Sequence, residues 1–268
     1  MSRITDTFAR NQAAQRKLLI PYIVAGDPHL DLSLEAMHGM VAAGADLIEL
    51  GVPFTDPEAE GPSIQLGHER ALKNNVSLRD TLHLVEQFRE TDQTTPVILM
   101  GYINPIEHMG YDTFASRAAA AGVDGTLIVN LPPEQGIELS ESLAANGLSP
   151  IYLLAPTTTD KRAAKISAIA QGFIYYVSLK GTTGASTINF DQVEERVNHL
   201  RSICTLPMVV GFGIKDGASA ARVAEFADGS VVGTAIVDIF AEYAEHPEQI
   251  VPKVSELLGD MRQQMDAS

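Results

Sequence analysis

Short apolar runs alternate with longer amphipathic segments along this chain of 268 residues. Runs rich in Val, Ile and Leu are typical of strands buried on both faces in a parallel sheet. Eight of them recur at nearly regular spacing, beginning at Leu18, Ala45, Pro96, Val123, Ser149, Gly172, Leu206 and Gly229. The pattern therefore predicts eight strands separated by helices.

The segments between the runs have helical length and period, and the clearest are 31–44, 77–90, 111–122, 133–147 and 191–203. Several end in a glycine, at Gly44, Gly122 and Gly147. Glycine adopts the left-handed conformation that commonly ends a helix, so the chain can turn back into a strand. Segment Ser2–Gln15 predicts an additional helix that covers the bottom of the sheet structure.

Strict alternation of strand and helix fits two architectures, an open doubly wound sheet and a closed barrel. The count of eight strands favours the barrel, as do the absence of an early GxGxxG fingerprint and the glycine turns after strands seven and eight. We therefore expect an α/β fold, a (β/α)8 TIM barrel with an extra N-terminal helix, as a single domain over residues 1–268.

The amino-acid composition narrows the classes of molecule that this chain is expected to bind. A formal net charge of −15 disfavours nucleic acid and anionic membranes, so a bound phosphate must be held locally by backbone N–H groups. The N-terminal segment has no apolar stretch of a secretion signal, which predicts a cytoplasmic protein. The single cysteine, Cys204, predicts no internal disulfide, and no Cys or His spacing indicates a metal site.

Glu49 lies inside the apolar run of the second strand, between Ile48 and Leu50. An ionised carboxylate there is costly unless it is paired, and alternation places it on the opposite face from its two neighbours. A structural glutamate bonded to backbone amides is one interpretation. Because reactive groups gather at the carboxyl ends of barrel strands, the other is a general acid/base whose pKa is raised by burial.

The loop after this strand, residues 53–62, is rich in proline and carboxylates. Acidic loops are usually only solvated, but at the catalytic end of a barrel this one predicts a second acid/base partner. Glycine turns at 181–185, 211–214 and 233–235 then predict a phosphate site, the last opening a short helix. No histidine pattern, GxSxG elbow or nucleotide loop is present. The residues thus favour cofactor-free acid/base chemistry on a phosphorylated molecule.

The runs IPYIVAGDP, AGADLIELGVPFTDPEAEGPSIQ, LMGYINPI, SLKGTTGA and VVGFGI, together with residues 122–134, resemble tryptophan synthase alpha chains in order and spacing. The resemblance covers the chain from about Phe8 to the last helix. It implies a lyase that cleaves indole-3-glycerol phosphate into indole and glyceraldehyde 3-phosphate in tryptophan biosynthesis.

By this resemblance Glu49 is the general acid/base, and Glu60 is the second carboxylate, where the family more usually has aspartate. Thr183 belongs to a loop that closes over substrate. The resemblance also implies phosphate contacts at Gly184, Gly213, Gly233 and Thr234, where threonine replaces the usual serine. It places the indole between Tyr22, Met100, Leu127, Val129, Leu153, Tyr175, Phe212 and Val231.

The resemblance further implies a partner, the beta chain, in an α2β2 heterotetramer whose pyridoxal phosphate is not bound by this chain. Loops Pro53–Glu60, Ile103–Pro105 and Asn130–Pro133 would meet that partner at the barrel mouth. Two alternatives stay open. One is a weakly active regulatory subunit that binds substrate and activates the beta chain, and the other is a barrel isomerase or epimerase of sugar phosphates.

Overall fold

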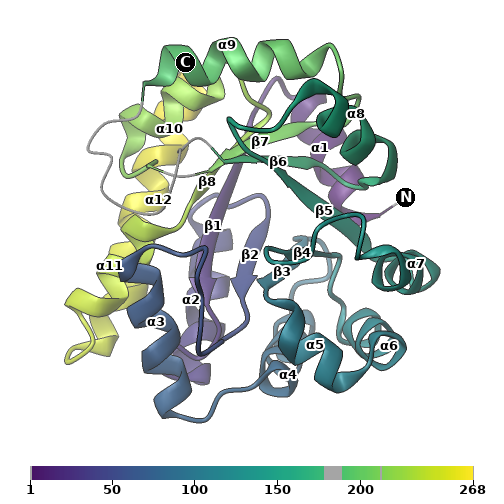
Figure 1. Ribbon diagram of the computed structural model, residues 1–268. Coiled ribbons are helices and arrows are strands. Elements are labelled where there is room, and N and C mark those ends of the chain that lie inside the picture. Colours follow the sequence, from purple (N-terminus) through teal and green to yellow (C-terminus); the bar gives the residue numbers. More distant parts are fainter. Residues whose placement is uncertain (1, 178–188, 212, 268) are drawn as a thin grey trace.

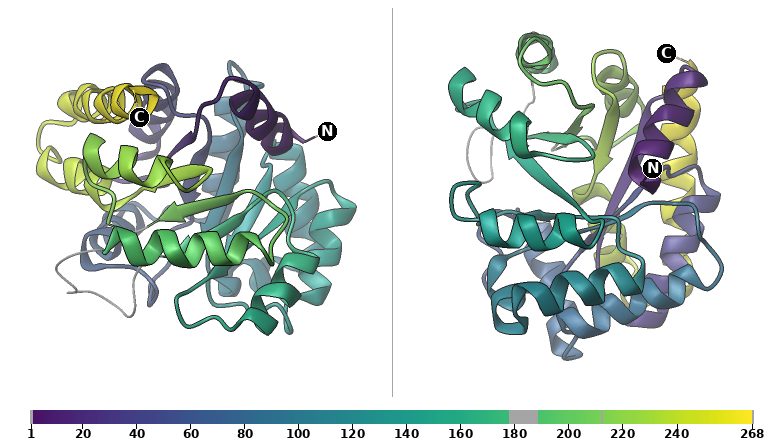
Figure 2. Two further views of the ribbon diagram at one scale, coloured as in Figure 1. Left: turned by 90° about the horizontal axis from the view of Figure 1, so that it is seen from above. Right: turned by 90° about the vertical axis from the view of Figure 1, so that its right-hand side faces the viewer.

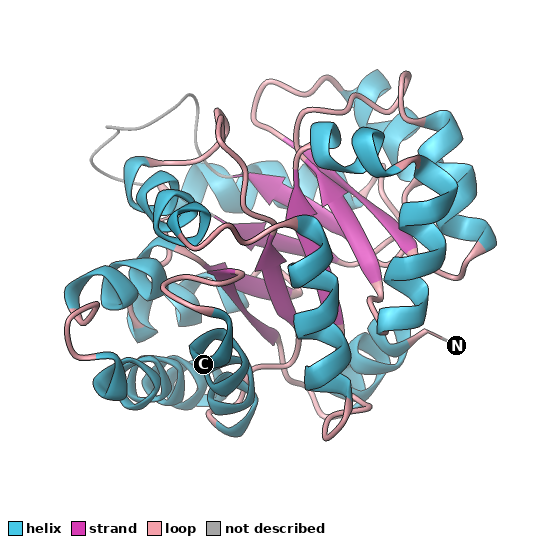
Figure 3. Ribbon diagram, turned by 90° about the horizontal axis from the view of Figure 1, so that it is seen from below, coloured by secondary structure: helices cyan, strands magenta, loops and turns pink. Residues whose placement is uncertain are grey.

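The apolar runs form parallel strands that close into a barrel. The structure, a computed structural model, describes residues 2–177, 189–211 and 213–267. Within these residues eight strands each pair in parallel with the next along the chain, and the last pairs with the first. Figures 1 and 3 show the strands in the centre and the helices around them. The predicted (β/α)8 barrel is confirmed.

Each strand is shorter than the apolar run that predicted it. The strands are β1 (Leu18–Val24), β2 (Ile48–Gly51), β3 (Val97–Gly101), β4 (Gly125–Ile128), β5 (Ser149–Leu154), β6 (Ile174–Val177), β7 (Met208–Gly211) and β8 (Gly229–Val232). The run that begins at Gly229 shows why, because its apolar residues after Val232 belong to a helix that starts at Thr234.

Helices follow the strands, as the helical periodicity of the segments between the apolar runs predicted. They are α1 (Arg3–Ala13), α2 (Leu30–Ala42), α3 (Pro62–Lys73), α4 (Leu78–Arg89), α5 (Ile103–Met109), α6 (Tyr111–Ala121), α7 (Ile137–Ala145), α8 (Asp160–Ile169), α9 (Phe190–Arg201), α10 (Gly217–Ala224), α11 (Thr234–Glu242) and α12 (Ile250–Ala267), with a 3-10 turn at Pro247–Gln249. The three glycines predicted to end helices have φ of +104°, +89° and +76°, which confirms their left-handed role.

The expected loop Ile103–Pro105 is wrong, because these residues form the first turn of α5. Tyr102 is its extended N-cap, so Pro105 stands where an N–H has no helical acceptor. Proline at this point starts a helix without breaking it.

The apolar residues divide into two cores. Inward strand residues such as Leu18, Ile20 and Leu47 fill the barrel, and outward ones such as Ile48 and Leu50 pack against the helices. Strand alternation produces this division.

Helix α1 covers the N-terminal end of the barrel, as predicted. Its Ser2 N-cap accepts from the Thr5 N–H, and its buried Phe8 ring lies 5.7 Å from that of Phe173, just before β6. Arg3 pairs at 3.0 Å with Asp124, just before β4. The right-hand view of Figure 2 places both chain ends on this side. Among the described helices, none is long and apolar enough to cross a membrane.

Candidate active site

Glu49 points into the barrel from the middle of β2. It is in register with Tyr22 on β1 and Ile98 on β3, both inward residues. Its side chain is 1% exposed, and its Oε1 has no hydrogen-bond partner among the described residues. Burial, and then the nearby charge of Glu60, raises the pKa of Glu49 to about 8. The carboxyl group therefore exchanges a proton near neutral pH, as the sequence predicted.

Glu60 is the buried carboxylate of the loop between β2 and α3. Asp56 and Glu58 of the same loop are exposed, whereas Glu60 is 3% exposed, and burial raises the pKa of its carboxyl group to about 7. The loop is held by its own backbone and by α3: the Glu60 N–H donates to Pro57 O at 3.0 Å, and Gln65 Nε2 donates to Glu60 O at 2.9 Å. These bonds fix the position of the second carboxylate.

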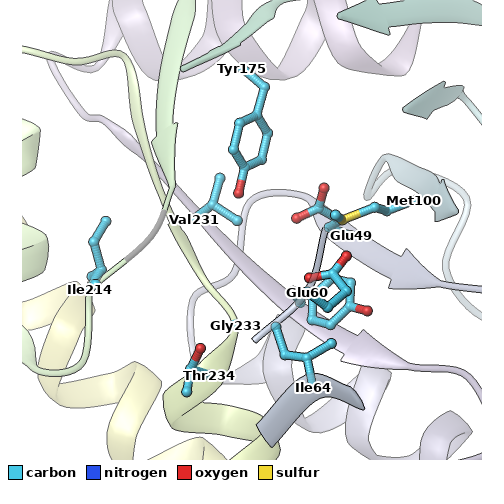
Figure 4. A pocket seen from close by; sticks show the side chains of 11 residues that line it. Glu49, Glu60, Ile64, Met100, Tyr175, Ile214, Val231, Gly233 and Thr234 are labelled. Atoms are coloured by element: carbon cyan, nitrogen blue, oxygen red, sulfur yellow. The ribbon is translucent and has the colours of Figure 1, made fainter. Parts of the chain in front are cut away.

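Both carboxylates line one pocket, which is partly open to solvent. It is lined by Tyr22, Glu49, Glu60, Ile64, Met100, Tyr175, Gly213, Ile214, Val231, Gly233 and Thr234. In Figure 4 the carboxylates of Glu49 and Glu60 lie on one side, and Thr234 and Ile214 lie across from them.

Most of the residues that the sequence proposed for the site meet in this pocket. Leu127, Val129 and Leu153 do not line it. Leu127 is 1% exposed within the barrel core, and the other two are partly buried and pack against that core from β4 and β5. Thr183, Gly184 and Phe212 lie outside the described residues.

Two lining residues were missed, Ile64 and Ile214. Both follow a predicted feature closely: Ile64 lies in the first turn of the helix after the Glu60 loop, and Ile214 follows Gly213. Neither stands on a strand, so strand alternation gave no signal for them. The only available signal was an apolar residue next to a proposed site residue.

The far end of the pocket has the features of an anion site. Gly213 has φ of +74° after β7, and Gly233 is the N-cap of α11. Within the described residues no side chain caps α11, whose Ile236 N–H donates to Gly233 O at 2.9 Å. The dipole of the helix favours a negative charge at this end. Thr234 adds a hydroxyl donor at the same place.

The pocket thus combines two buried carboxyl groups whose pKa values are raised toward neutral pH, apolar and aromatic walls, and the N-terminus of a helix. Within the described residues no group of three His, Cys, Asp or Glu side chains could hold a metal ion. This arrangement can move protons on an aromatic molecule that is anchored by a phosphate.

Comparison with known proteins decides the family. The model of the family described as tryptophan synthase alpha chain matches residues 8–266. The chain belongs to the tryptophan synthase alpha chain family. It is 54% identical over 266 residues to the alpha chain of Thioalkalivibrio sulfidiphilus, covering 99% of this chain and 100% of that one. It is 54% identical over 268 residues to that of Nitrosococcus oceani, covering 100% and 99%.

Solved structures agree with the sequence relatives. The tryptophan synthase alpha subunit of Legionella pneumophila superposes with a TM-score of 0.93 at 44% identity and covers both chains completely. A chain of tryptophan synthase from M. tuberculosis, in an aminoacrylate-bound form, has a TM-score of 0.87 at 32% identity, covering 99% and 100%.

Family membership settles the reaction. The tryptophan synthase alpha chain family catalyses cleavage of indole-3-glycerol phosphate in tryptophan biosynthesis, and this chain is an enzyme of that family. The alternative of a sugar-phosphate isomerase is therefore set aside. Pyridoxal phosphate belongs to the beta chain of tryptophan synthase and not to this family.

Proposed function

We propose that Glu49 and Glu60 carry the proton transfers of the alpha reaction in this chain. The observation that supports the proposal is that two buried carboxyl groups with pKa values of about 8 and about 7 line one pocket. Two such groups act as one titrating pair, which shares a single proton near neutral pH. We assign that proton to Glu49, which stands on a strand in the apolar interior of the barrel, and the negative charge to Glu60.

In this state each group has a role. The Glu49 carboxyl protonates C3 of the indole ring, and the Glu60 carboxylate holds the indole N–H while positive charge develops on the ring. The ionised Glu49 then removes the proton of the 3′-hydroxyl. The bond between indole C3 and the glycerol chain breaks, which releases indole and the aldehyde of glyceraldehyde 3-phosphate. Glu49 ends the cycle protonated, as it began.

The positions of these residues give the substrate one orientation in the pocket. The phosphate binds at Gly213, Gly233 and Thr234, opposite the carboxylates. We propose Gly184 as a further phosphate contact and Thr183 as the residue of the loop that closes over bound substrate and orients the second carboxylate. The indole lies between the walls nearest Glu49, with Tyr22, Met100, Tyr175 and Val231 as lining residues; Leu127, Val129, Leu153 and Phe212 stay proposed members of this slot.

The beta chain of tryptophan synthase is the partner. The match to a chain of the M. tuberculosis enzyme supports an α2β2 assembly, in which the beta chain supplies pyridoxal phosphate and uses the indole. The proposed contact surface is the barrel mouth, formed by Pro53–Glu60, residues 130–133 and the first turn of α5. Leu66 on α3, six residues beyond the first of these segments in the chain, has 52% of its surface exposed. A single barrel domain working in the cytoplasm fits this role.

Indole release from indole-3-glycerol phosphate tests the function. Glu49→Gln preserves shape but removes the proton, so turnover should fall by about 10²–10⁴. Exposed Glu69→Gln on α3 is the matched control for the loss of one charge. Undiminished turnover of the Glu49 variant would refute the assignment.

The same assay, with and without the beta chain, separates an enzyme from a regulatory subunit. The lyase releases indole in at least one of the two conditions. No release in either, with the beta reaction still stimulated, would support the regulatory alternative.

A further inference from the structure

His68 is a buried titratable group that the proposed mechanism leaves unused. It lies on α3, one turn beyond Ile64, with 2% of its surface exposed. Its Nδ1 is 3.1 Å from the backbone nitrogen of Phe54, and its Nε2 is 3.4 Å from the hydroxyl of Tyr22. The imidazole therefore connects the loop that carries Glu60 with a side chain that lines the pocket.

The contacts of His68 fix where its proton is. A backbone N–H can only donate, so Nδ1 accepts from Phe54 and carries no hydrogen. Burial lowers the pKa of His68 to about 4, which keeps the ring neutral at neutral pH. The one ring proton is then on Nε2, and the Tyr22 oxygen accepts it across a long hydrogen bond.

A hydroxyl that accepts from one side directs its own hydrogen elsewhere. The Tyr22 ring packs closely over Gly51, since a Cβ built on that glycine would lie only 2.3 Å from the Tyr22 Oη. Burial, then the charge of Glu60 and then that of Glu49, raises the pKa of Tyr22 well above its usual range. The Glu60 carboxylate is thus the strongest charge that the hydroxyl meets.

The other groups around Tyr22 do not compete for this hydrogen. The titratable groups that face it from neighbouring elements of the described structure are Glu49, Glu60, His68, Tyr102 and Tyr175. Farther along α3, Arg70 pairs with Asp27 through two bonds of 2.7 Å and 2.8 Å, and these two charges satisfy one another. Of the groups that face Tyr22, only Glu60 and Glu49 are carboxylates.

We propose that His68 is a positioning residue of the alpha reaction: through Nε2–H it orients the Tyr22 hydroxyl so that the hydroxyl hydrogen faces the Glu60 carboxylate. This inference rests on the proposed function, because it matters only if Glu60 works in its ionised form. A dipole with its positive end toward a carboxylate favours ionisation. The His68–Tyr22 pair therefore keeps Glu60 charged down to a lower pH than burial alone would allow.

The two nitrogens of His68 are tested separately. The amide of Asn stands near the position of Nδ1, so His68→Asn keeps an acceptor for Phe54 and loses the donor to Tyr22. The longer Gln stands near Nε2, so His68→Gln keeps the donor. Tyr22→Phe keeps the ring and removes only the hydroxyl.

The measurement is the pH dependence of kcat/KM for indole release, which reports the pKa values of the free enzyme. Tyr22→Phe and His68→Asn should each shift the acidic limb of this pH profile to higher pH by about 0.5–1 unit, since loss of the dipole raises the pKa of Glu60. His68→Gln should keep the limb of the wild type. The double variant His68→Asn/Tyr22→Phe should move it no further than Tyr22→Phe alone, because the histidine acts through the hydroxyl.

An unmoved acidic limb in Tyr22→Phe overturns the proposal, and this conservative variant does not depend on the folding of the histidine variants. Additive shifts in the double variant also overturn it, since they would mean that His68 only holds the loop. The Glu49→Gln variant distinguishes a failure of this inference from a failure of the proposed function. If that variant is inactive while these limbs stay in place, this inference fails and the proposed function stands; if it is fully active, the proposed function itself fails.

Discussion

Replacing Glu49 by Gln should stabilise the folded protein at alkaline pH while it removes activity. Burial and the charge of Glu60 raise the pKa of Glu49 from its ordinary value of 4.5 to about 8. The folded state therefore binds this proton more tightly than the unfolded chain does. The stability that the bound proton contributes is complete below pH 4.5 and is lost as the pH rises through 8.

The magnitude follows from the size of the shift. Roughly 3.5 pH units correspond to about 5 kcal/mol, since one unit is about 1.4 kcal/mol. Gln carries no charge, so its variant does not lose this stability. Any fixed cost of burying the amide is the same at every pH and cancels when two pH values are compared.

Thermal unfolding at pH 5 and pH 8.5 measures the effect. Between pH 5 and pH 8.5 about 4 kcal/mol of this stability is lost, because part of the loss occurs below pH 5. The difference in Tm between Glu49→Gln and the wild type should therefore be more positive at pH 8.5 by roughly 8–16 °C, using about 2–4 °C per kcal/mol for a chain of this size. Glu69→Gln, on the exposed face of α3, is the control for the change in net charge. A Tm difference that is equal at the two pH values would refute the reasoning, because the ionised carboxylate would then cost nothing in the fold.

Three further measurements probe the pocket. The kcat/KM of the wild type should depend on pH as a bell with limbs near pH 7 and pH 8, because the pair of Glu49 and Glu60 must hold one proton in the free enzyme. A kcat/KM that is constant from pH 5.5 to 9.5 would contradict this. Gly51→Ala should lower the free energy of unfolding in urea by about 1–3 kcal/mol, since the new Cβ would lie 2.3 Å from the Tyr22 hydroxyl. Adding Tyr22→Phe should recover part of that loss, and an unchanged urea midpoint in Gly51→Ala would count against the close contact. Thr234→Ala should raise KM at least about tenfold with little change in kcat, because one hydroxyl bond to a charged group contributes about 1.5–3 kcal/mol. Thr234→Ser keeps the hydroxyl and should therefore keep the KM of the wild type. An unaltered KM in Thr234→Ala would remove Thr234 from the proposed phosphate site.

The sequence predicted what strand alternation and spacing determine. Eight runs at regular intervals gave the barrel, and the period of two gave the inward direction of Glu49, because Ile48 and Leu50 pack outward. Glycine turns after the last two strands indicated the part of the pocket that Gly213 and Gly233 line. These features depend on neighbours in the chain, so a sequence contains them.

Features that depend on distant segments were not predictable in this way. Met100 and Leu127 are inward residues in register on neighbouring strands, yet only Met100 lines the pocket. Strand alternation predicts which face of the sheet a residue occupies, but not which other segments cover that residue. Ile64 and Ile214 reach the pocket from a helix and a turn. The partners of His68 lie 14 and 46 residues away in the chain, so no local pattern pointed to its role.

The two glutamates owe their chemistry to different parts of the fold. Glu49 stands on a strand in the centre of the barrel, where its position is fixed and its Oε1 lacks a partner among the described residues. Glu60 stands on a loop, and loops are mobile unless they are tied down. Gln65, His68 and Tyr102 each bond to the backbone of this loop or its start, through Glu60 O, the Phe54 N–H and the Ala59 N–H. The loop is therefore anchored by side chains that do not themselves line the pocket. Such anchoring matters because a second carboxylate helps only if it stays within reach of the same substrate as the first.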